Sequence, residues 1–307
     1  MKHLLFLLLI CPFCIEGSRA QSLPERLGYP KDTKLLIIHA DDLGVSHAEN
    51  AASIAAFERG LVNSGSIMVP CPWFPEIAAY ARAHPEADLG LHLTLTSEWK
   101  QYKWGPVVAG EQTAGLVDAQ GYFFDNTTSV ATKASPDEVE REIRAQIERA
   151  KQFGVDPTHF DAHMAGMFVR PEFFKLYLDL SHEYRVPVLI VKEIFTRLNI
   201  NQNNYVTDQD VVLDQLFMAE PADYAAGMEA YYTRVLKEVQ PGLSCLLIHV
   251  AYDNAEMQAV TVDHPDYGAA WRQADFDFFT GAKCRQLLKE QNIRLITWRE
   301  IRDKLYR

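Results

Sequence analysis

Short apolar runs that alternate with helical stretches are the feature that most limits the fold of this chain. The first run, 35–38, is Leu-Leu-Ile-Ile and leads into polar, turn-forming residues, as a buried strand does where it reaches a loop. Short strands that alternate with helices imply parallel strands joined by crossover helices. Six further runs lie at 66–69, 89–93, 158–160, 188–191, 246–248 and 293–296, and the clearest helical stretches are 48–59, 136–153, 171–184, 222–239 and 281–291. Seven strands favour a barrel over an open sheet, so the sequence predicts an α/β protein with a seven-stranded (β/α) barrel-like fold.

Two segments, 97–133 and 199–214, interrupt this alternation. The first holds several aromatic residues among glycines and polar residues, and the second is polar and rich in Asn and Gln. Long loops in a compact domain usually serve as lids or binding loops. Because neither a linker nor an internal repeat divides the chain, we expect a single domain at 21–307.

Residues 1–20 have the order of a secretory signal peptide. Lys2 precedes an apolar run at 4–10, and 18–20 reads Ser-Arg-Ala, a small-x-small cleavage site. We therefore expect cleavage near Ala20 and a secreted or periplasmic protein. The apolar run is too short for a transmembrane helix, which needs about 20 apolar residues. Since no later segment comes close to that length, we expect no membrane span.

The charge of the chain argues against one class of partner. The formal net charge is −11, and removing the predicted signal peptide, which carries a net charge of +1, leaves −12. An acidic chain without a basic cluster is poorly suited to bind a phosphate backbone. We expect a neutral or cationic substrate and no nucleic-acid partner.

Three cysteines, Cys71, Cys245 and Cys284, remain once the predicted signal peptide is removed. An odd number without CxxC spacing indicates neither a disulfide framework nor a thiolate metal site. One disulfide with a spare thiol and three buried thiols are both compatible with the sequence. Lipidation at Cys11 or Cys14 is the less favoured alternative to a cleaved signal peptide, because a bulky residue precedes each of them.

The strongest local pattern is the pair Asp41-Asp42, which comes soon after the first apolar run. Parallel α/β folds place their active sites at the carboxyl ends of the strands, where this pair is expected. An Asp-Asp pair alone is equally compatible with a helix N-cap beside a solvated neighbour. Its interpretation therefore depends on what the other strand ends carry.

Two histidine motifs follow at later strands. His92 lies inside the apolar run 89–93, and 159–163 reads His-Phe-Asp-Ala-His. A single histidine in a strand is more often a hydrogen-bonded core residue than a ligand. Period-two alternation, however, points His159, Asp161 and His163 to one face.

Asp42, His92 and His163 together suggest a metal centre. Three strand ends that carry Asp, His and His make an open site with mixed oxygen and nitrogen ligands, as catalytic metal sites have. The set is compatible with zinc, magnesium, manganese or nickel. We predict that these three residues meet at the mouth of the fold and bind a divalent metal ion.

These motifs resemble those of the YdjC/ChbG-like carbohydrate deacetylases, in the same order and through nearly all of the chain after residue 20. The resemblance implies a seven-stranded (β/α) barrel-like fold, a divalent metal ion such as Mg²⁺ or Zn²⁺, and action on N-acetylated sugars such as chitin oligosaccharides. The matching residues are Ala40-Asp41-Asp42-Leu43-Gly44 with Ser46, Asn50, Gly60 and Ser66-Ile67-Met68, then Gly90-Leu91-His92-Leu93, His159-Phe160-Asp161-Ala162-His163, Leu246-Leu247-Ile248-His249, Trp271-Arg272-Gln273-Ala274-Asp275 and Ile293-Arg294-Leu295-Ile296.

The resemblance also implies a role for each matching position. Asp42, His92 and His163 would be the metal ligands, and Asp41 would be the general base. Amide hydrolysis also needs an acid that protonates the leaving amine, and His249 at the end of a late strand is the candidate. The alternative is a core histidine beneath the barrel mouth. Many family members continue with Pro-Gly after this histidine, whereas Val250 follows here, so the loop geometry is expected to differ.

Five further residues are candidates around this site. Asp161 could orient a ligand imidazole from behind, or be an ordinary carboxylate at a strand end. Arg272 could touch the site, although a surface ion pair with Asp275 is the more common arrangement. The remaining three are aromatic residues that could stack on a sugar or simply pack the loop after His92, and they are Trp99, Tyr102 and Trp104.

The function expected from these observations is metal-dependent deacetylation of N-acetylated sugars. Two alternatives stay open: hydrolysis of another amide, an ester or a glycosidic bond, and carbohydrate binding without catalysis. Retaining glycoside hydrolysis needs two carboxyl groups about 5 Å apart on either side of the bond, whereas the neighbours Asp41 and Asp42 are expected to diverge. Loss of Asp41 or a ligand would favour a binding protein, and none of them is lost.

Overall fold

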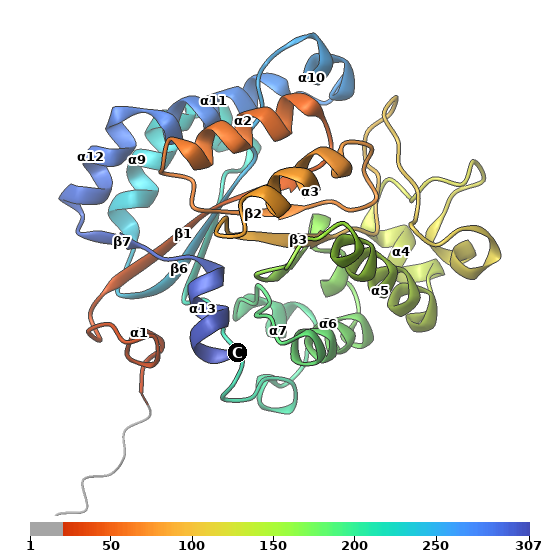
Figure 1. Ribbon diagram of the computed structural model, residues 1–307, viewed down its shortest axis with the longest axis horizontal. Coiled ribbons are helices and arrows are strands. Elements are labelled where there is room, and N and C mark those ends of the chain that lie inside the picture. The colour runs from red at the N-terminus through yellow and green to blue at the C-terminus, as the bar shows by residue number, and fades with distance from the viewer. Residues whose placement is uncertain (1–20) are drawn as a thin grey trace, which may run out of the picture.

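A computed structural model of the chain describes residues 21–307 (Figure 1). The predicted signal peptide at 1–20, with its cleavage site near Ala20, lies outside these residues. Within 21–307, none of the helices has the length and apolar character that crossing a bilayer requires.

Seven strands of this part of the chain form one parallel sheet. The central strand β1 (Lys34–Leu43) pairs with β6 along one edge, and with β7 and then β2 along the other. The order is β4-β3-β2-β1-β6-β5, with β7 beside β1. The other strands are β2 (Ser64–Ile67), β3 (Leu89–Leu93), β4 (Phe160–Ala162), β5 (Gln215–Met218), β6 (Gly242–Ile248) and β7 (Ile293–Leu295).

The sheet curls, and segment 188–191 lies between its two outer strands. Single parallel bridges join Phe160 of β4 to Val188, and Val191 to Leu213 just before β5. The Leu189 N–H donates to the Phe160 carbonyl, whereas the Ile190 carbonyl accepts from the Leu213 N–H, both within 3.0 Å. These alternating bonds complete a barrel-like arrangement, so the predicted fold class is confirmed.

One strand prediction needs correction. The apolar run 188–191 was expected to be a regular strand, but its hydrogen bonds to its two neighbours are single and it forms no continuous ladder. Strand β5 takes a regular place in the sheet instead, directly after the polar segment 199–214. Its sequence Gln-Leu-Phe-Met is too short to show a clear period.

Helices surround the sheet, and each of the five predicted helical stretches corresponds to at least one of them (Figure 1). The predicted helix 222–239 is two helices, because Gly227 has φ 107° and breaks the hydrogen-bonded ladder between α8 and α9. The helices are α1 (Leu23–Arg26), α2 (His47–Glu58), α3 (Phe74–Ala83), α4 (Thr127–Lys133), α5 (Pro136–Gln152), α6 (Pro171–Tyr184), α7 (Glu193–Arg197), α8 (Pro221–Ala226), α9 (Met228–Glu238), α10 (Ala255–Val260), α11 (Ala269–Thr280), α12 (Ala282–Glu290) and α13 (Trp298–Leu305), with 3₁₀ turns η1 (Gly110–Leu116), η2 (His163–Phe168) and η3 (Gln202–Asn204).

Helix α5 fixes the long segment 97–133 against the sheet. The helix begins with a capping box between Ser135 and Glu138. Its buried face carries polar side chains among apolar ones. One of them is Glu142, whose carboxylate accepts hydrogen bonds from the backbone N–H groups of Val107 and Val108, each at 2.9 Å. Because buried carboxylates need such partners, the segment is held in one conformation. This segment was expected to be a loop, and it contains η1 and α4.

Candidate active site

The paired carboxylates Asp41 and Asp42 lie at an irregularity near the carboxyl end of β1. The β1–β2 register shifts between Ala40 and Leu43, and Asp42 has φ 65°, a left-handed conformation that is uncommon outside glycine and most tolerable for Asn and Asp. Neighbouring residues of a regular strand point to opposite faces. Here, both Asp41 and Asp42 line the same cavity, so the expected divergence of their side chains does not occur.

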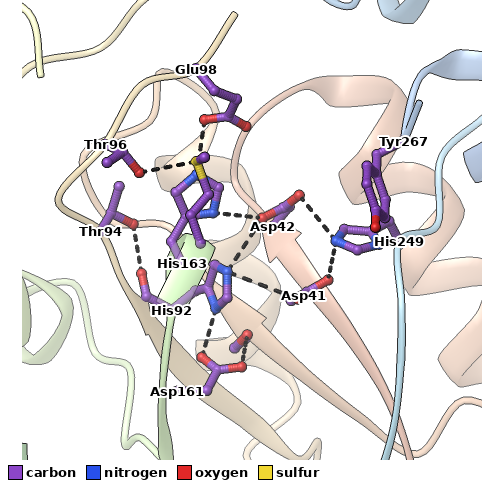
Figure 2. Close-up of polar contacts among 12 residues, drawn as sticks. Asp41, Asp42, His92, Thr94, Thr96, Glu98, Asp161, His163, His249 and Tyr267 are labelled. Atoms are coloured by element: carbon purple, nitrogen blue, oxygen red, sulfur yellow. Dashed lines mark hydrogen bonds and ion pairs between the residues drawn. The ribbon is translucent and has the colours of Figure 1, made fainter. Parts of the chain in front are cut away.

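Asp42 lies between two imidazoles (Figure 2). Its Oδ1 is 3.4 Å from Nε2 of His92 and 3.3 Å from Nδ1 of His163. One ligand atom from each of the three residues lies within 4.8 Å of the other two. Asp42 Oδ1 is also buried and has no hydrogen-bond partner among the described residues. A buried acceptor without a partner is unfavourable, so this donor set fits a divalent cation.

A carboxylate stands behind each of these imidazoles. Nδ1 of His92 lies 2.8 Å from Oδ1 of Asp161, and Nε2 of His163 lies 2.9 Å from Oε2 of Glu98. In the neutral form of each imidazole, the carboxylate accepts a hydrogen bond from the nearer N–H, and the lone pair of the other nitrogen then faces Asp42. Both imidazoles therefore have the orientation that metal ligation requires.

Neighbouring charged groups strongly shift the pKa values of His163 and Asp161. Burial by itself would lower the pKa of His163, but the carboxylates of Glu98 and Asp42 raise that pKa to about 10. Burial would raise the pKa of Asp161, but His92 and His39 hold it below its usual range. The second oxygen of Asp161 accepts from Nε2 of His39 and from the Ser66 hydroxyl, each at 2.9 Å. Asp161 is thus an anion fixed on both sides.

Arg272 belongs to the site, contrary to the expected surface ion pair. Its side chain is buried, and it donates to Oδ2 of Asp42 at 2.8 Å and to the carboxylate of Glu49. Burial would raise the pKa of Asp42, but the guanidinium keeps that pKa well below its usual range. Asp275, the expected partner, is also buried and accepts instead from the His249 backbone N–H at 3.0 Å and the Tyr232 hydroxyl at 2.6 Å.

His249 faces Asp41 across the same cavity (Figure 2). Its Nε2 is 3.3 Å from Oδ1 of Asp41, an oxygen that is buried and has no hydrogen-bond partner among residues 21–307. Burial lowers the pKa of His249, and the Tyr267 ring meets its imidazole edge to face with centroids 5.3 Å apart. The bond from its N–H to Asp275 anchors this backbone, although the family's usual Pro-Gly is replaced here from Val250 onward.

Of the three predicted aromatic residues, only Trp99 lines the cavity. The Tyr102 hydroxyl donates to the Val45 carbonyl at 2.6 Å, and Nε1 of Trp104 donates to the Thr96 carbonyl at 2.9 Å. Both rings pack against Trp99 within the segment itself. The structure therefore leaves Trp99 as a candidate contact for a sugar and assigns Tyr102 and Trp104 to loop packing.

The cavity has a volume of about 730 Å³, within the range of small-molecule sites.

Sequence reasoning missed Glu98 and Glu49. Glu98 lies only six residues after His92, but loop carboxylates are common and no spacing rule selects it. Glu49 looks like an ordinary residue in the first turn of α2.

The three remaining cysteines, Cys71, Cys245 and Cys284, are free and buried.

Comparisons with known proteins place the chain in a family. The model of the family described as YdjC-like protein matches residues 35–290. A carbohydrate deacetylase of Thermus thermophilus is 33% identical over 92% of this chain and 98% of its own length. Another, from Brevibacillus brevis, is 26% identical over 87% of this chain and 99% of its own length.

The fold has a counterpart among solved structures. A protein of Enterococcus faecalis V583, whose name connects it with cellobiose-phosphate cleavage, matches 87% of this chain and 98% of its own with a TM-score of 0.70 and 24% identity. At that identity the likeness concerns the fold alone. The family match, in contrast, spans the strands from β1 to β6 and every residue of the site described above. On this match, the chain belongs to the YdjC-like protein family.

Proposed function

We propose that the protein is a metal-dependent hydrolase that removes acetyl groups from N-acetylated sugar units, with chitin-type oligosaccharides as the substrate class. One observation carries the proposal: Oδ1 of Asp42 and Oδ1 of Asp41 are both buried, both lack hydrogen-bond partners among the described residues, and both belong to side chains that line one cavity with the imidazoles of His92, His163 and His249. The names of the relatives from Thermus thermophilus and Brevibacillus brevis support the reaction type.

Asp42, His92 and His163 would hold the metal ion. A divalent ion bound there would polarise the amide carbonyl and make a water molecule more acidic. Two imidazoles and one carboxylate suit Zn²⁺, whereas Mg²⁺ prefers oxygen ligands. Glu98 and Asp161 keep both imidazoles oriented, and Arg272 holds the second oxygen of the Asp42 carboxylate.

Asp41 is the general base of the proposed reaction. Its Oδ1 would accept the proton of the water that attacks the carbonyl carbon, because this side chain lines the cavity and the oxygen has no competing donor among the described residues. The oxygen of the water forms the new bond to carbon as its proton moves to the carboxylate. Asp41 therefore handles the proton while Asp42 is occupied by the metal ion and Arg272.

His249 is the general acid. As the carbon–nitrogen bond breaks, the leaving nitrogen takes a proton from Nε2 of His249, and free amine and acetate result. Nε2 lies 3.3 Å from Oδ1 of Asp41, so the proton taken up by the base can pass to this imidazole. Because burial lowers the pKa of His249, the imidazole readily gives up that proton.

The expected site of action is outside the cytoplasm. The order of residues 1–20, with Lys2, an apolar run and Ser18-Arg19-Ala20, supports export to the periplasm or the medium. Expression with and without residues 1–20, followed by fractionation, tests this assignment.

Acetate release from chitin oligosaccharides is the decisive measurement. Metal-reconstituted protein is expected to release acetate, and an Asp41→Asn variant that binds the same amount of metal is expected to release little. Shortened oligosaccharides without acetate would instead show glycosidic cleavage. Binding of the oligosaccharides without turnover under any divalent metal would show a carbohydrate-binding protein.

A further inference from the structure

One side of the cavity consists of aliphatic side chains. We call this side the aliphatic wall. It lies on β5, β6 and the segment that precedes and begins α7, and it lines the same cavity as Asp42 of β1 and His92 of β3. Its members are Leu189, Val191, Ile194, Leu216, Met218 and Leu247.

The alternation of the strands builds this wall. Leu216 and Met218 are two residues apart on β5, so they point to the same face, and Leu189 and Val191 of segment 188–191 line the same cavity. Met218 is also in register with Leu247 of β6, two residues before His249. The wall is therefore continuous, and it begins beside the proposed general acid.

The aliphatic wall differs from the hydrophobic core because several of its side chains are partly exposed. Met218 is 40% exposed, and Leu216 and Leu247 are half-buried, although all three line a concave space. Exposed apolar surface of this kind usually marks a binding site. Sugar hydroxyls placed against it would lose water without gaining a partner, which is unfavourable. Two charged residues of α7, Glu193 and Arg197, line the cavity beside Ile194.

We propose that the natural substrate carries an apolar group close to the amide that is cleaved, and that the aliphatic wall binds this group. The inference rests on the proposed function, because it assumes that the amide carbonyl binds beside Asp42. The apolar group has two chemical sources, an acyl chain longer than acetyl or an apolar substituent on the sugar. Both would leave the hydroxyls of the sugar at the polar side of the cavity.

Two substrate series distinguish the sources. The first is N-acetyl-, N-butanoyl- and N-hexanoylglucosamine, and the second is the methyl, butyl and octyl glycosides of N-acetylglucosamine. Release of free amine by the metal-reconstituted protein gives kcat/KM for each compound. Each methylene that leaves water is expected to raise kcat/KM about fourfold in one of the two series.

Variants of the wall connect that gain with its residues. Met218→Gln and Val191→Thr keep nearly the same size but place a polar group in the wall, so we expect them to remove most of the gain along the series that shows it. Met218→Leu should retain the gain. Val262→Thr, at a residue that is 40% exposed and does not line the cavity, is the matched control.

The two proposals fail in different ways. If N-acetylglucosamine compounds are cleaved but kcat/KM is flat or falls along both series, the wall has no such role and the proposed function stands. If none of the amides is cleaved under any metal, the proposed function is wrong and the inference falls with it. An unchanged gain in Met218→Gln and Val191→Thr would also overturn the assignment to the wall.

Discussion

The two sides of the cavity are built on different principles. On the side of β1 and β3, hydrogen bonds hold the imidazoles of the proposed ligands, because Asp161 contacts His92 and Glu98 contacts His163. On the aliphatic wall, side chains such as Leu216 and Val191 meet only through packing. Directional interactions fix atoms to within fractions of an ångström, whereas packing fixes shape and volume. We therefore expect abrupt losses from changes on the first side and graded effects on the second.

The largest effect should come from Asp41→Asn. The change keeps the size of the side chain and removes the proposed base, so kcat should fall by about 10²–10⁴-fold. Metal content should stay the same, because Asp42, His92 and His163 are unchanged. Single-turnover kinetics and metal analysis on the same samples provide the measurement. Loss of metal together with activity would show that Asp41 is a ligand.

Asp275 accepts the backbone N–H of His249, and its buried carboxyl group should make the stability of the fold depend on pH. Burial raises the pKa of Asp275 to about 7. A carboxyl group whose pKa is raised in the folded state stabilises it fully below about pH 4 and loses this contribution as pH rises through about 7. Relative to Asp275→Asn, the wild type should therefore lose up to about 4 kcal/mol of unfolding free energy between pH 4 and 8.

Urea denaturation at several pH values measures this difference. Asp277→Asn is the matched control, because Asp277 is an exposed carboxylate on the same helix, α11. If the unfolding free energies of wild type and Asp275→Asn change in parallel across the pH range, the pKa of Asp275 is not raised in the folded state and this prediction is wrong.

The carboxylates behind the ligands should act on metal affinity. Asp161→Asn and Glu98→Gln each replace the anion that orients an imidazole, so metal affinity should fall by about 10–100-fold. Calorimetric titration of the metal-free variants gives the affinity without any assay of activity. Asp210→Asn breaks another pair, in which Asp210 lies 2.7 Å from Nε2 of His182 away from the cavity, and should leave affinity unchanged. Equal losses in all three variants would indicate a general effect on folding.

The smallest effect is expected on the aliphatic wall. Ile194→Val removes one methylene from a residue that is 6% exposed, and the unfolding free energy should fall by about 0.5–1.5 kcal/mol. Metal affinity and the rate with acetylated substrates should change by about twofold or less, because the shape of the wall is nearly kept. A loss of metal affinity would contradict the independence of the two sides.

The sequence predicts the architecture, and it also predicts that Asp42, His92 and His163 lie close together, for a simple reason. The apolar runs at 35–38 and 89–93 carry their polar residues at the carboxyl ends, and parallel strands bring such ends together. Helix α6 was predicted at its observed bounds, 171–184, because Pro171 marks its first turn. Local pattern and tertiary structure agree in these elements.

The remaining parts of the site depend on contacts that local patterns do not record. Arg272 has an acidic neighbour three residues away, yet it pairs with Asp42, which is 230 residues away in the sequence. Glu98 meets His163 only because α5 fixes its segment against the sheet. Segment 188–191 has a strand-like composition, but its place between β4 and the residues before β5 allows only single bridges.

The position of β1 bears on how the molecule opens. This strand is bonded to β6 along 34–40, to β7 along 34–36 and to β2 at His39, Ala40 and Leu43, so its amides up to Ala40 are well protected. Amides in such a place exchange with solvent only when the whole domain unfolds. The segment 199–214 is held mostly by hydrogen bonds of local turns and should exchange sooner. The two carboxylates are therefore attached to the part of the chain that opens last, and substrate can enter through local motions elsewhere without disturbing them.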